Sequence, residues 1–410
     1  MNIIVIGGGA AGLMAAGTAA EQGANVTLFE TNEKVGRKLF ITGKGRCNVC
    51  NDCDAQEVLR NVPVNPRFLY SALGAFSPAD VKAFFEEKGV ALKTERGNRV
   101  FPVSDRASDI IDALFLWVRR TGVSIVHASV SDLVMQDGRV TGVRAGKKTC
   151  LADRVIVATG GASYPQTGST GDGYRLAGSL GHTIIEPRGS LVPLVEKGHT
   201  CGAMQGLALK NVEVKLLDAK GKCVFSEFGE LLFTHFGLSG PVILSASCHM
   251  QRGKEDYRIV IDLKPALDEK TLYDRLTRDF AEQGAHSVQG ALAKLLPNSM
   301  RPVAVKKWGV DPATRAAQIT REQKMALVHL CKHWQVPVNA LGDKEHAVIT
   351  AGGVDVREVD PKTMASKLCE GLYFAGEVLD VDARTGGYNL QVAFSTGALA
   401  GHSAAVYERE

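Results

Sequence analysis

The N-terminal thirty residues hold the pattern that most constrains the fold: a strand, a glycine-rich turn, a helix and a second strand. Residues 3–6 read Ile-Ile-Val-Ile, a β-branched run typical of a buried parallel strand. Gly7, Gly9 and Gly12 follow in G-x-G-x-x-G spacing, a helix is expected over 13–22, and the strand over 25–29 ends at Glu30. This order predicts a Rossmann-type unit that binds a dinucleotide.

Each part of this unit has a physical role. Gly7 permits a tight turn, Gly9 lets the backbone approach a pyrophosphate, and Gly12 allows the helix to pack closely on the strand. Amides at the helix N-terminus, around Ala11, are expected to donate to the phosphates. Glu30 is expected to accept hydrogen bonds from ribose hydroxyls.

A long basic loop over 36–48 favours FAD over NAD as the dinucleotide. A plain NAD dehydrogenase would continue with short strand–helix units, whereas this loop suits an extended anionic cofactor. Its predicted cofactor-binding residues are cations that would lie near phosphate or ribose and glycines that would admit a flat ring: Arg37, Lys38, Arg46, Gly43 and Gly45.

Two later strands end in turns that indicate the same cofactor. The strand over 154–158 leads into an A-T-G turn, with Thr159, Gly160 and Gly161 predicted beside the flavin. The strand over 372–375 leads into Gly376 and Glu377, and Glu377 would bind the ribityl hydroxyls.

The final helix opens at a second glycine turn. We predict that its first residues face the pyrimidine side of the flavin, where negative charge develops on reduction and the positive helix end is favourable. These cofactor-binding residues are Gly387, Tyr388, Asn389 and Leu390.

Six blocks in this order resemble one family: GGGAAGLMAA at 7–16, GRKLFITGKGRCNVCN at 36–51, RVFPVS at 99–104, ATGGASYPQTGSTGDGY at 158–174, GELLFTHFGLSGPVIL at 229–244 and GLYFAGEVLDVDARTGGYNLQVAFSTG at 371–397. The chain is similar from end to end to the bacterial BaiN-like or YhiN-like flavoproteins, also called the aminoacetone-oxidase family. The resemblance implies an α/β fold with a Rossmann-type FAD-binding domain of the two-dinucleotide-binding type, an inserted antiparallel β domain and a small helical domain.

The hydrophobic pattern is consistent with that organisation. Short alternating strands over 190–263 predict the β domain, and a helical period over 268–334 predicts the helical one. We predict a discontinuous FAD-binding domain of 1–189 and 347–410, a β-rich domain of 190–265 and 335–346, and a basic helical domain of 266–334.

Three residues are candidates for proton transfer at the flavin. Cys47 lies in the basic loop, His235 lies in a block shared with the family, and Tyr388 would lie over the ring. A structural role is a competing interpretation for each of them. Cys47 also begins a Cys-x-x-Cys-x-x-Cys run, but no fourth ligand lies nearby, so we predict no metal site.

The net charge of +4 is concentrated in one segment. Residues 294–334 hold eight Lys and Arg against two Asp and Glu, a net of +6, which leaves −2 for the rest of the chain. This segment also contains Trp308, Trp334, His329 and His333, and cations among exposed aromatics suit an RNA backbone and an unstacked base. A solvated helical face is the alternative; if RNA binds here, Lys306, Lys307, Arg315 and Arg321 are the predicted contacts.

The resemblance implies a two-electron reaction at the flavin. The leading hypothesis is NAD(P)H-driven reduction of an activated C=C bond, either of uracil in 23S rRNA to dihydrouridine or of a steroid-like enone. The NAD(P)H site would be transient, because the sequence holds no second G-x-G-x-x-G unit after a strand. A flavin oxidase of a small amine or aminoketone that releases peroxide, and a non-catalytic RNA-binding or redox-sensing flavoprotein, stay open.

Composition narrows the setting. The chain is 45% apolar and 22% charged, which excludes wholesale disorder and a multi-span membrane protein. Residues 1–20 are uncharged but lack a basic n-region and contain five glycines, so no signal segment and no membrane partner are expected. Nine cysteines without a disulfide spacing indicate a reducing compartment, the cytoplasm. The sequence does not predict an oligomeric state.

Overall fold

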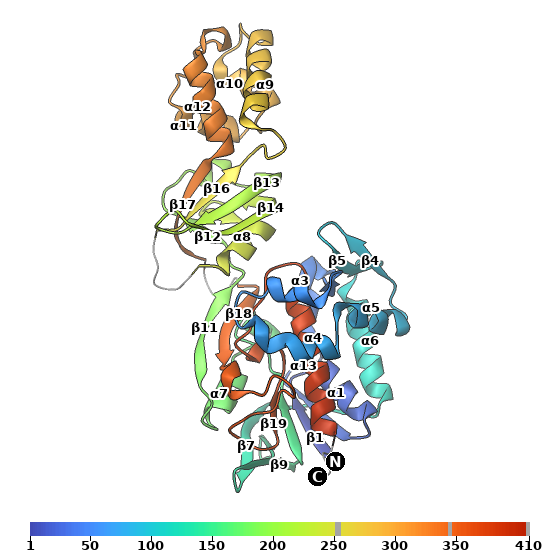
Figure 1. Ribbon diagram of the computed structural model, residues 1–410. Helices are drawn as coiled ribbons and strands as arrows, with labels where there is room; N and C mark the ends of the chain where they lie inside the picture. Colours follow the sequence, from blue (N-terminus) through green and yellow to red (C-terminus); the bar gives the residue numbers. More distant parts are fainter. Residues whose placement is uncertain (251–255, 343–346, 407–410) are drawn as a thin grey trace. The chain divides into compact units, whose positions relative to one another are not determined.

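The computed structural model of the protein describes residues 1–250, 256–342 and 347–406 (Figure 1). It divides into two compact units, unit 1 from residues 1–190 and 344–410, and unit 2 from residues 191–343. The expected class is confirmed: a parallel sheet with helices in unit 1, and antiparallel strands and helices in unit 2. The three-domain division stays a prediction, and its boundary at 346 lies outside the described residues.

Unit 1 is built on a five-stranded sheet in the order β19-β10-β1-β2-β6, with every neighbouring pair parallel. The β-branched run predicted at the N-terminus is the central strand β1, and Ile3, Val5 and their neighbours are almost fully buried between the layers. The sheet strands are β1 (Asn2–Ile6), β2 (Asn25–Glu30), β6 (Ser124–His127), β10 (Arg154–Val157) and β19 (Leu372–Phe374).

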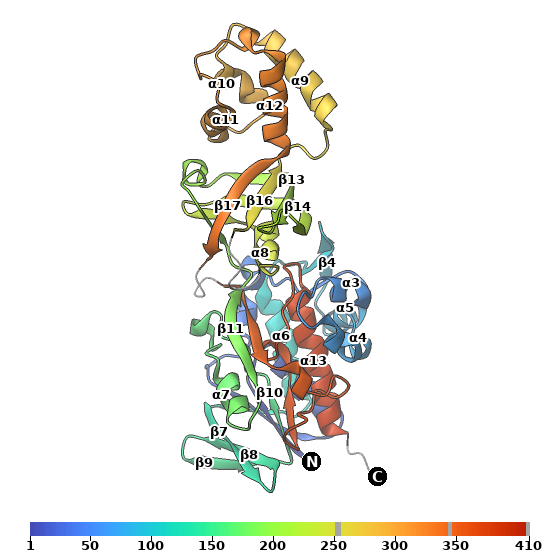
Figure 2. The same ribbon diagram turned by 60° about the vertical axis from the view of Figure 1, so that its left-hand side comes forward.

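Two helices far apart in sequence pack closely beside this sheet. They are α1 (Ala10–Glu21) and the C-terminal helix α13 (Tyr388–Ala405), which lie side by side in Figures 1 and 2. A Cβ on Gly397 would lie 2.5 Å from the Ala11 carbonyl oxygen, and one on Gly401 would lie 2.3 Å from that of Ala15. Glycine one turn apart on α13 therefore lets the two backbones meet, which fixes both helix N-termini relative to the sheet.

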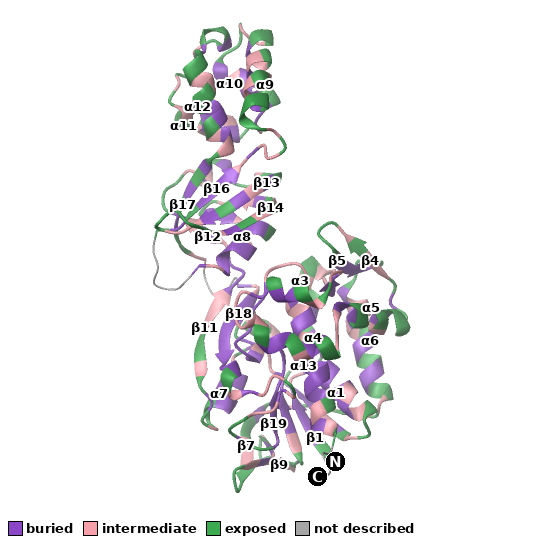
Figure 3. Ribbon diagram, viewed as in Figure 1, coloured by how far each residue is buried: buried purple, intermediate pink, exposed green. Residues whose placement is uncertain are grey.

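The remaining elements of unit 1 surround this core. The meander β7-β8-β9 packs against β10, β11 pairs antiparallel with β18, and β3, β5 and β4 form a small sheet. Figure 3 shows β18 drawn as buried, in agreement with its accessibility at all six residues. The strands are β3 (Cys50–Asn51), β4 (Leu92–Glu95), β5 (Arg99–Pro102), β7 (Val130–Gln136), β8 (Arg139–Ala145), β9 (Lys148–Leu151), β11 (Ile184–Ser190) and β18 (Ile349–Val354). The helices are α2 (Arg37–Ile41), α3 (Ala55–Arg60), α4 (Tyr70–Ala75), α5 (Pro78–Glu87), α6 (Ala107–Arg120) and α7 (Asp172–Gly178).

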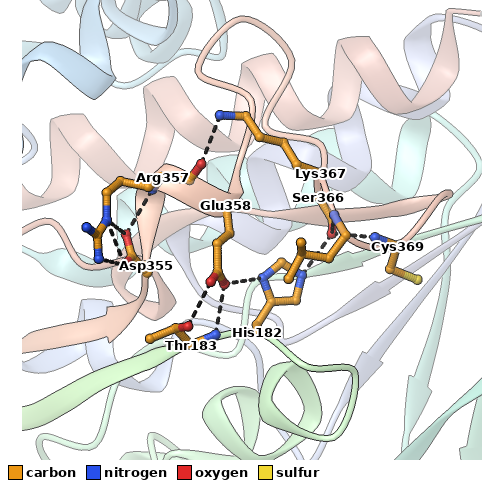
Figure 4. Close-up of polar contacts among 9 residues, drawn as sticks. His182, Thr183, Asp355, Arg357, Glu358, Ser366, Lys367 and Cys369 are labelled. Carbon is orange, nitrogen blue, oxygen red and sulfur yellow. Dashed lines mark hydrogen bonds and ion pairs between the residues drawn. The ribbon is translucent and has the colours of Figure 1, made fainter.

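A buried polar network fastens the segment after β18 to the start of β11 (Figure 4). His182 Nε2 lies 2.8 Å from Ser366 Oγ, and its Nδ1 lies 3.3 Å from Glu358 Oε2. Glu358 also accepts hydrogen bonds from the backbone and hydroxyl of Thr183. Burial lowers the pKa of His182 and favours its neutral form. Since Ser366 Oγ also accepts two backbone amides, the network holds the loop in place rather than presenting a nucleophile.

Unit 2 contains a closed barrel in the order β12-β15-β14-β13-β16-β17. The alternating pattern predicted over 212–216 is confirmed in β13, where Val212, Val214 and Leu216 are buried. The barrel strands and the helix beside them are β12 (Leu194–Glu196), β13 (Ala208–Leu217), β14 (Cys223–Phe233), β15 (Gly237–Ser239), β16 (Arg258–Asp262), β17 (Trp334–Leu341) and α8 (Pro241–Ser247).

The helical part of unit 2 is inserted between the neighbouring strands β16 and β17. Its helices are α9 (Glu269–Glu282), α10 (Val288–Ala291), α11 (Met300–Trp308) and α12 (Arg321–Lys332). One expectation is wrong: Trp334 is not an exposed aromatic but opens β17 with 0% exposure, because the large indole fills the junction between barrel and helices. None of the described helices combines the length and apolarity needed to cross a membrane.

Candidate cofactor-binding site

The predicted cofactor residues of unit 1 gather at one edge of the parallel sheet. Strands β1, β2, β10 and β19 are parallel, so the turns that follow them share the carboxyl edge, where ligands of open α/β sheets bind. These turns carry the residues predicted from four separate stretches of sequence. The sheet topology thus brings together Gly7, Glu30, Thr159 and Glu377.

The turn after β1 has glycines with different functions. Gly7 has φ +105°, and a Cβ on it would lie 2.5 Å from the Ala158 carbonyl oxygen. A Cβ on Gly12 would lie 1.8 Å from the Gly7 oxygen, so the protein itself requires both glycines. Gly9 has an ordinary φ of −83°, and a Cβ on it would meet no heavy atom within 4 Å. The space at Gly9 is therefore open to a ligand, which fits the pyrophosphate role predicted for it.

Glu30 is held against this turn. It is 8% exposed, its Oε2 accepts from the Gly8 amide at 2.8 Å, and its Oε1 accepts from the Asn32 amide and side chain at 2.7 Å. Each carboxylate oxygen has a further lone pair for a ribose hydroxyl. The fixed position of the acid is consistent with its predicted role.

A second acid is fixed on the far side of the sheet edge. Glu377 forms an ion pair with Lys38 at 2.7 Å, and both side chains are 21% exposed. Its Oε1 also accepts from the Thr350 amide at 2.8 Å and from Ser163 Oγ at 3.1 Å. A Cβ on Gly161 would lie 2.9 Å from the same oxygen, so this glycine leaves room for the acid. Two predicted cofactor residues from opposite ends of the chain thus meet directly.

The two arginines of the basic loop have different surroundings. Arg37 donates from Nη1 to Asn32 Oδ1 at 2.8 Å, near the Glu30 end of the site. Arg46 pairs with Glu95 at 2.6 Å and Asp105 at 2.9 Å, and its guanidinium lies 4.0 Å from the centre of the Phe101 ring. Its predicted cofactor contact stays a prediction, and in this structure its charge is already balanced.

The loop between these arginines has a left-handed backbone. Gly43 and Gly45 have φ values of +57° and +84°, and Lys44 between them has +60°. A Cβ on Gly45 would meet nothing within 4 Å, whereas one on Gly43 would lie 3.0 Å from the Asn48 amide nitrogen. This part of the loop therefore presents backbone rather than side chains, as the predicted contact with a flat ring requires.

The N-terminus of α13 lies against the segment that follows the basic loop. Gly387 caps the helix with φ +99°, and a Cβ on it would lie 2.4 Å from the carbonyl carbon of Cys50. Asn389 receives a hydrogen bond from the Ala383 amide and donates to the carbonyl oxygens of Ala383 and Arg384. The first turn has no acidic residue, so its amides and dipole favour negative charge. Tyr388 is 9% exposed and Leu390 is half-buried.

The three predicted proton-transfer residues lie in different settings. Cys47 is fully buried, and burial raises the pKa of its thiol to about 12, which keeps it protonated. Tyr388 is buried in the first turn of α13. His235 is exposed in the turn between β14 and β15 of unit 2. The catalytic role of each stays a prediction.

The sequence reasoning missed a buried acid close to the α13 turn. Asp382 is 1% exposed, and its Oδ2 accepts from Ser190 Oγ at 2.8 Å. Its Oδ1 is buried without a hydrogen-bond partner among the described residues. Burial raises its pKa to about 6. Two acids, Asp380 and Asp382, alternate with valine just before the glycine turn, and this pattern is the signal that could have identified the residue.

Comparison with known proteins identifies close similarity along the whole chain. A family model described as the HI0933-like protein Rossmann domain matches residues 1–403. The chain is 31% identical over 412 residues to a 3-dehydro-bile acid Δ(4,6)-reductase of Clostridium scindens, with 99% of each chain covered. It is 32% identical over 400 residues to a ribosomal RNA dihydrouridine synthase of Haemophilus influenzae, with 96% of each covered.

A solved structure supports the fold alone. The 3-ketosteroid Δ1-dehydrogenase of Sterolibacterium denitrificans, in complex with 1,4-androstadiene-3,17-dione, is similar with a TM-score of 0.50 and 14% identity. The match covers 98% of this chain and 99% of the dehydrogenase.

Proposed function

The chain belongs to the HI0933-like Rossmann-domain family and is an FAD-dependent oxidoreductase, and we propose that it reduces an activated carbon–carbon double bond. Two relatives that cover almost the whole chain support this reaction. The names of both describe saturation of a C=C bond conjugated to a carbonyl group, in a bile acid or in a uracil of rRNA. Reduced FAD would supply the hydride, and NAD(P)H is the donor that we propose for reducing it.

Residues of unit 1 would bind and orient the cofactor. The open space at Gly9 would admit the pyrophosphate, and Glu30 would accept from the adenosine ribose. Lys38 and Glu377 would contact the ribityl chain and phosphate, at the cost of loosening their ion pair. The amides at the start of α13 would lie against the pyrimidine side of the ring.

Asp382 is the group that we propose as the proton store for this reaction. Saturation of the double bond requires a hydride at the carbon β to the carbonyl and a proton at the α carbon. Asp382 is buried, keeps one oxygen without a partner, and directly precedes the segment that Asn389 ties to α13. A carboxyl with a pKa of about 6 can hold a proton and release it near neutral pH. Cys47, His235 and Tyr388 remain the alternative donors.

The observation that favours rRNA as the substrate is the set of cations on the helical part of unit 2. The four predicted contact residues are all exposed, and none of them forms an ion pair with a described carboxylate: Lys306, Lys307, Arg315 and Arg321. By contrast, Lys294 and Lys332 of the same segment are neutralised by Glu282 and Asp262. Unpaired surface cations are free to replace counterions on RNA phosphates. We therefore place the protein in the cytoplasm, where rRNA is available.

Anaerobic stopped-flow measurements test this function. The flavin is reduced with NADPH or NADH and then mixed with unmodified 23S rRNA fragments, with a steroid enone, or with oxygen. We expect RNA to reoxidise the flavin fastest and to gain dihydrouridine. A faster reaction with the enone would identify a small-molecule reductase, as the 31% identical relative suggests. Rapid reoxidation by oxygen with peroxide release would refute the reductase proposal.

A charge-neutralised variant separates RNA binding from flavin chemistry. Replacing the four cations by glutamine should weaken RNA binding and flatten its dependence on log salt by about 0.7–0.9 per lost phosphate contact. Flavin reduction by NAD(P)H should be unchanged, because the substituted residues lie outside the cofactor site. Lys294→Gln, which removes a cation already paired with Glu282, is the matched control. RNA affinity and salt dependence that equal those of the native protein would refute the RNA contact.

A further inference from the structure

Two helices of unit 2 bring three metal-binding side chains together on the surface. His329 and His333 lie one turn apart near the end of α12, with ring centroids 4.6 Å apart. Glu269 is the first residue of α9, and its Oε1 lies 3.9 Å from His333 Nε2. One ligand atom from each of the three residues lies within 4.8 Å of the other two. All three side chains are exposed to solvent.

From this geometry we propose that His329, His333 and Glu269 form a surface Zn²⁺ site. Two imidazoles and one carboxylate are a ligand set that zinc uses in open sites, with water in the fourth position. In a tetrahedral Zn²⁺ site the ligand atoms are about 3.4 Å apart, so the side chains must close by about 1.5 Å at most. Exposed side chains can make this change by rotation. The proposal is independent of the oxidoreductase function.

The fold holds the backbone of this cluster in place. Lys332, between the two histidines, turns away from them and pairs with Asp262 at 2.6 Å. Its ammonium also donates to the carbonyl oxygens of Lys264 and Leu267, in the segment that leads into α9. The end of α12 and the start of α9 are thus joined beside the proposed site. A pre-ordered backbone lowers the entropy that ligand binding would otherwise cost.

The neighbouring residues add two further anchors. Cys331 and Trp334 on either side of the histidine pair are buried, so the helix end cannot rotate freely. Asp268 caps α9 by accepting from the Thr271 amide at 2.6 Å, which fixes the position of Glu269. The site also lies at the C-terminal end of α12, where the helix dipole favours a cation.

Titration of the FAD-loaded protein with Zn²⁺ against a chromophoric zinc indicator tests the proposal. We expect one Zn²⁺ per chain in addition to any bound by cysteines. Loss of an outer-shell partner costs about 10–100-fold in metal affinity, so His329→Ala, His333→Ala and Glu269→Gln should each weaken binding by at least about tenfold. His286→Ala removes another exposed histidine of unit 2 and should leave the affinity unchanged.

Two further measurements make the outcome decisive. Co²⁺ in place of Zn²⁺ should give visible absorption bands at wavelengths longer than the flavin bands, and the double variant His329→Ala/His333→Ala should lack them. Circular dichroism checks that the variants fold, as expected for exposed positions. Equal Zn²⁺ stoichiometry and affinity in the native protein and the double variant would overturn the proposal. Binding that disappears only after thiol alkylation would overturn it as well.

Discussion

Replacing Asp382 by asparagine tests whether this buried carboxyl holds a proton. The side chain is 1% exposed, and burial raises its pKa from the ordinary 3.8 to about 6. Asparagine has nearly the same shape and can still accept the hydrogen bond from Ser190 Oγ. The substitution therefore removes the ionisation of the group while keeping its packing.

The magnitude follows from linkage between protonation and folding. A pKa of about 6 in the folded state against 3.8 in the unfolded state corresponds to about 3 kcal/mol. Because the folded pKa is raised, the native state binds the extra proton, and stability falls as pH rises from about 4 to about 6. About 1.4 kcal/mol of this loss falls between pH 5 and pH 8. The Asp382→Asn apoprotein lacks this component.

Urea unfolding of the two apoproteins at pH 5, 6, 7 and 8 measures the effect. The free energy of unfolding of the variant, relative to the native protein, should rise by about 1.4 kcal/mol from pH 5 to pH 8. Asp355→Asn is the matched control, since Asp355 is also buried but pairs with Arg357, which lowers its pKa. Its carboxyl is ionised in both states above pH 5, so its effect should not change with pH. A pH-independent difference for Asp382→Asn would refute the proposed proton store.

Two other predictions follow from the geometry of unit 1. Gly9→Ala should change the stability of the apoprotein by less than about 0.5 kcal/mol but weaken FAD binding, because the space at its Cβ is free of protein atoms. Gly12→Ala should destabilise the apoprotein by about 1–3 kcal/mol, since its Cβ would lie 1.8 Å from the Gly7 oxygen; urea unfolding and flavin fluorescence distinguish the two, and full FAD affinity in Gly9→Ala would contradict the role of this space. Cys47, buried with a pKa of about 12, should react with a thiol reagent at pH 8 only after unfolding, whereas the exposed Cys223 should react at once; mass spectrometry of the labelled peptides decides this, and early labelling of Cys47 would show that the loop opens.

The sequence alone was sufficient where function depends on backbone geometry. The strand, the glycine spacing and Glu30 lie within one continuous stretch, and steric rules for Gly7 and Gly12 act between near neighbours along the chain. The fold class followed from the same local patterns and from the resemblance of six ordered blocks. Trp334 shows the limit of this reasoning, because a helical period and nearby cations do not reveal which residue fills the junction of barrel and helices.

Properties that depend on distant residues were decided by the tertiary structure. The pairing of Lys38 with Glu377 joins residues 339 positions apart, and the partner of Arg46 is a carboxylate in another small sheet. The raised pKa of Asp382 arises from burial, which composition does not report. Glu269 meets His329 and His333 only because two helices of unit 2 end beside each other. Local sequence determines which residues can form a turn, a strand or a cap, whereas charge pairing, desolvation and ligand clusters require the chain to fold.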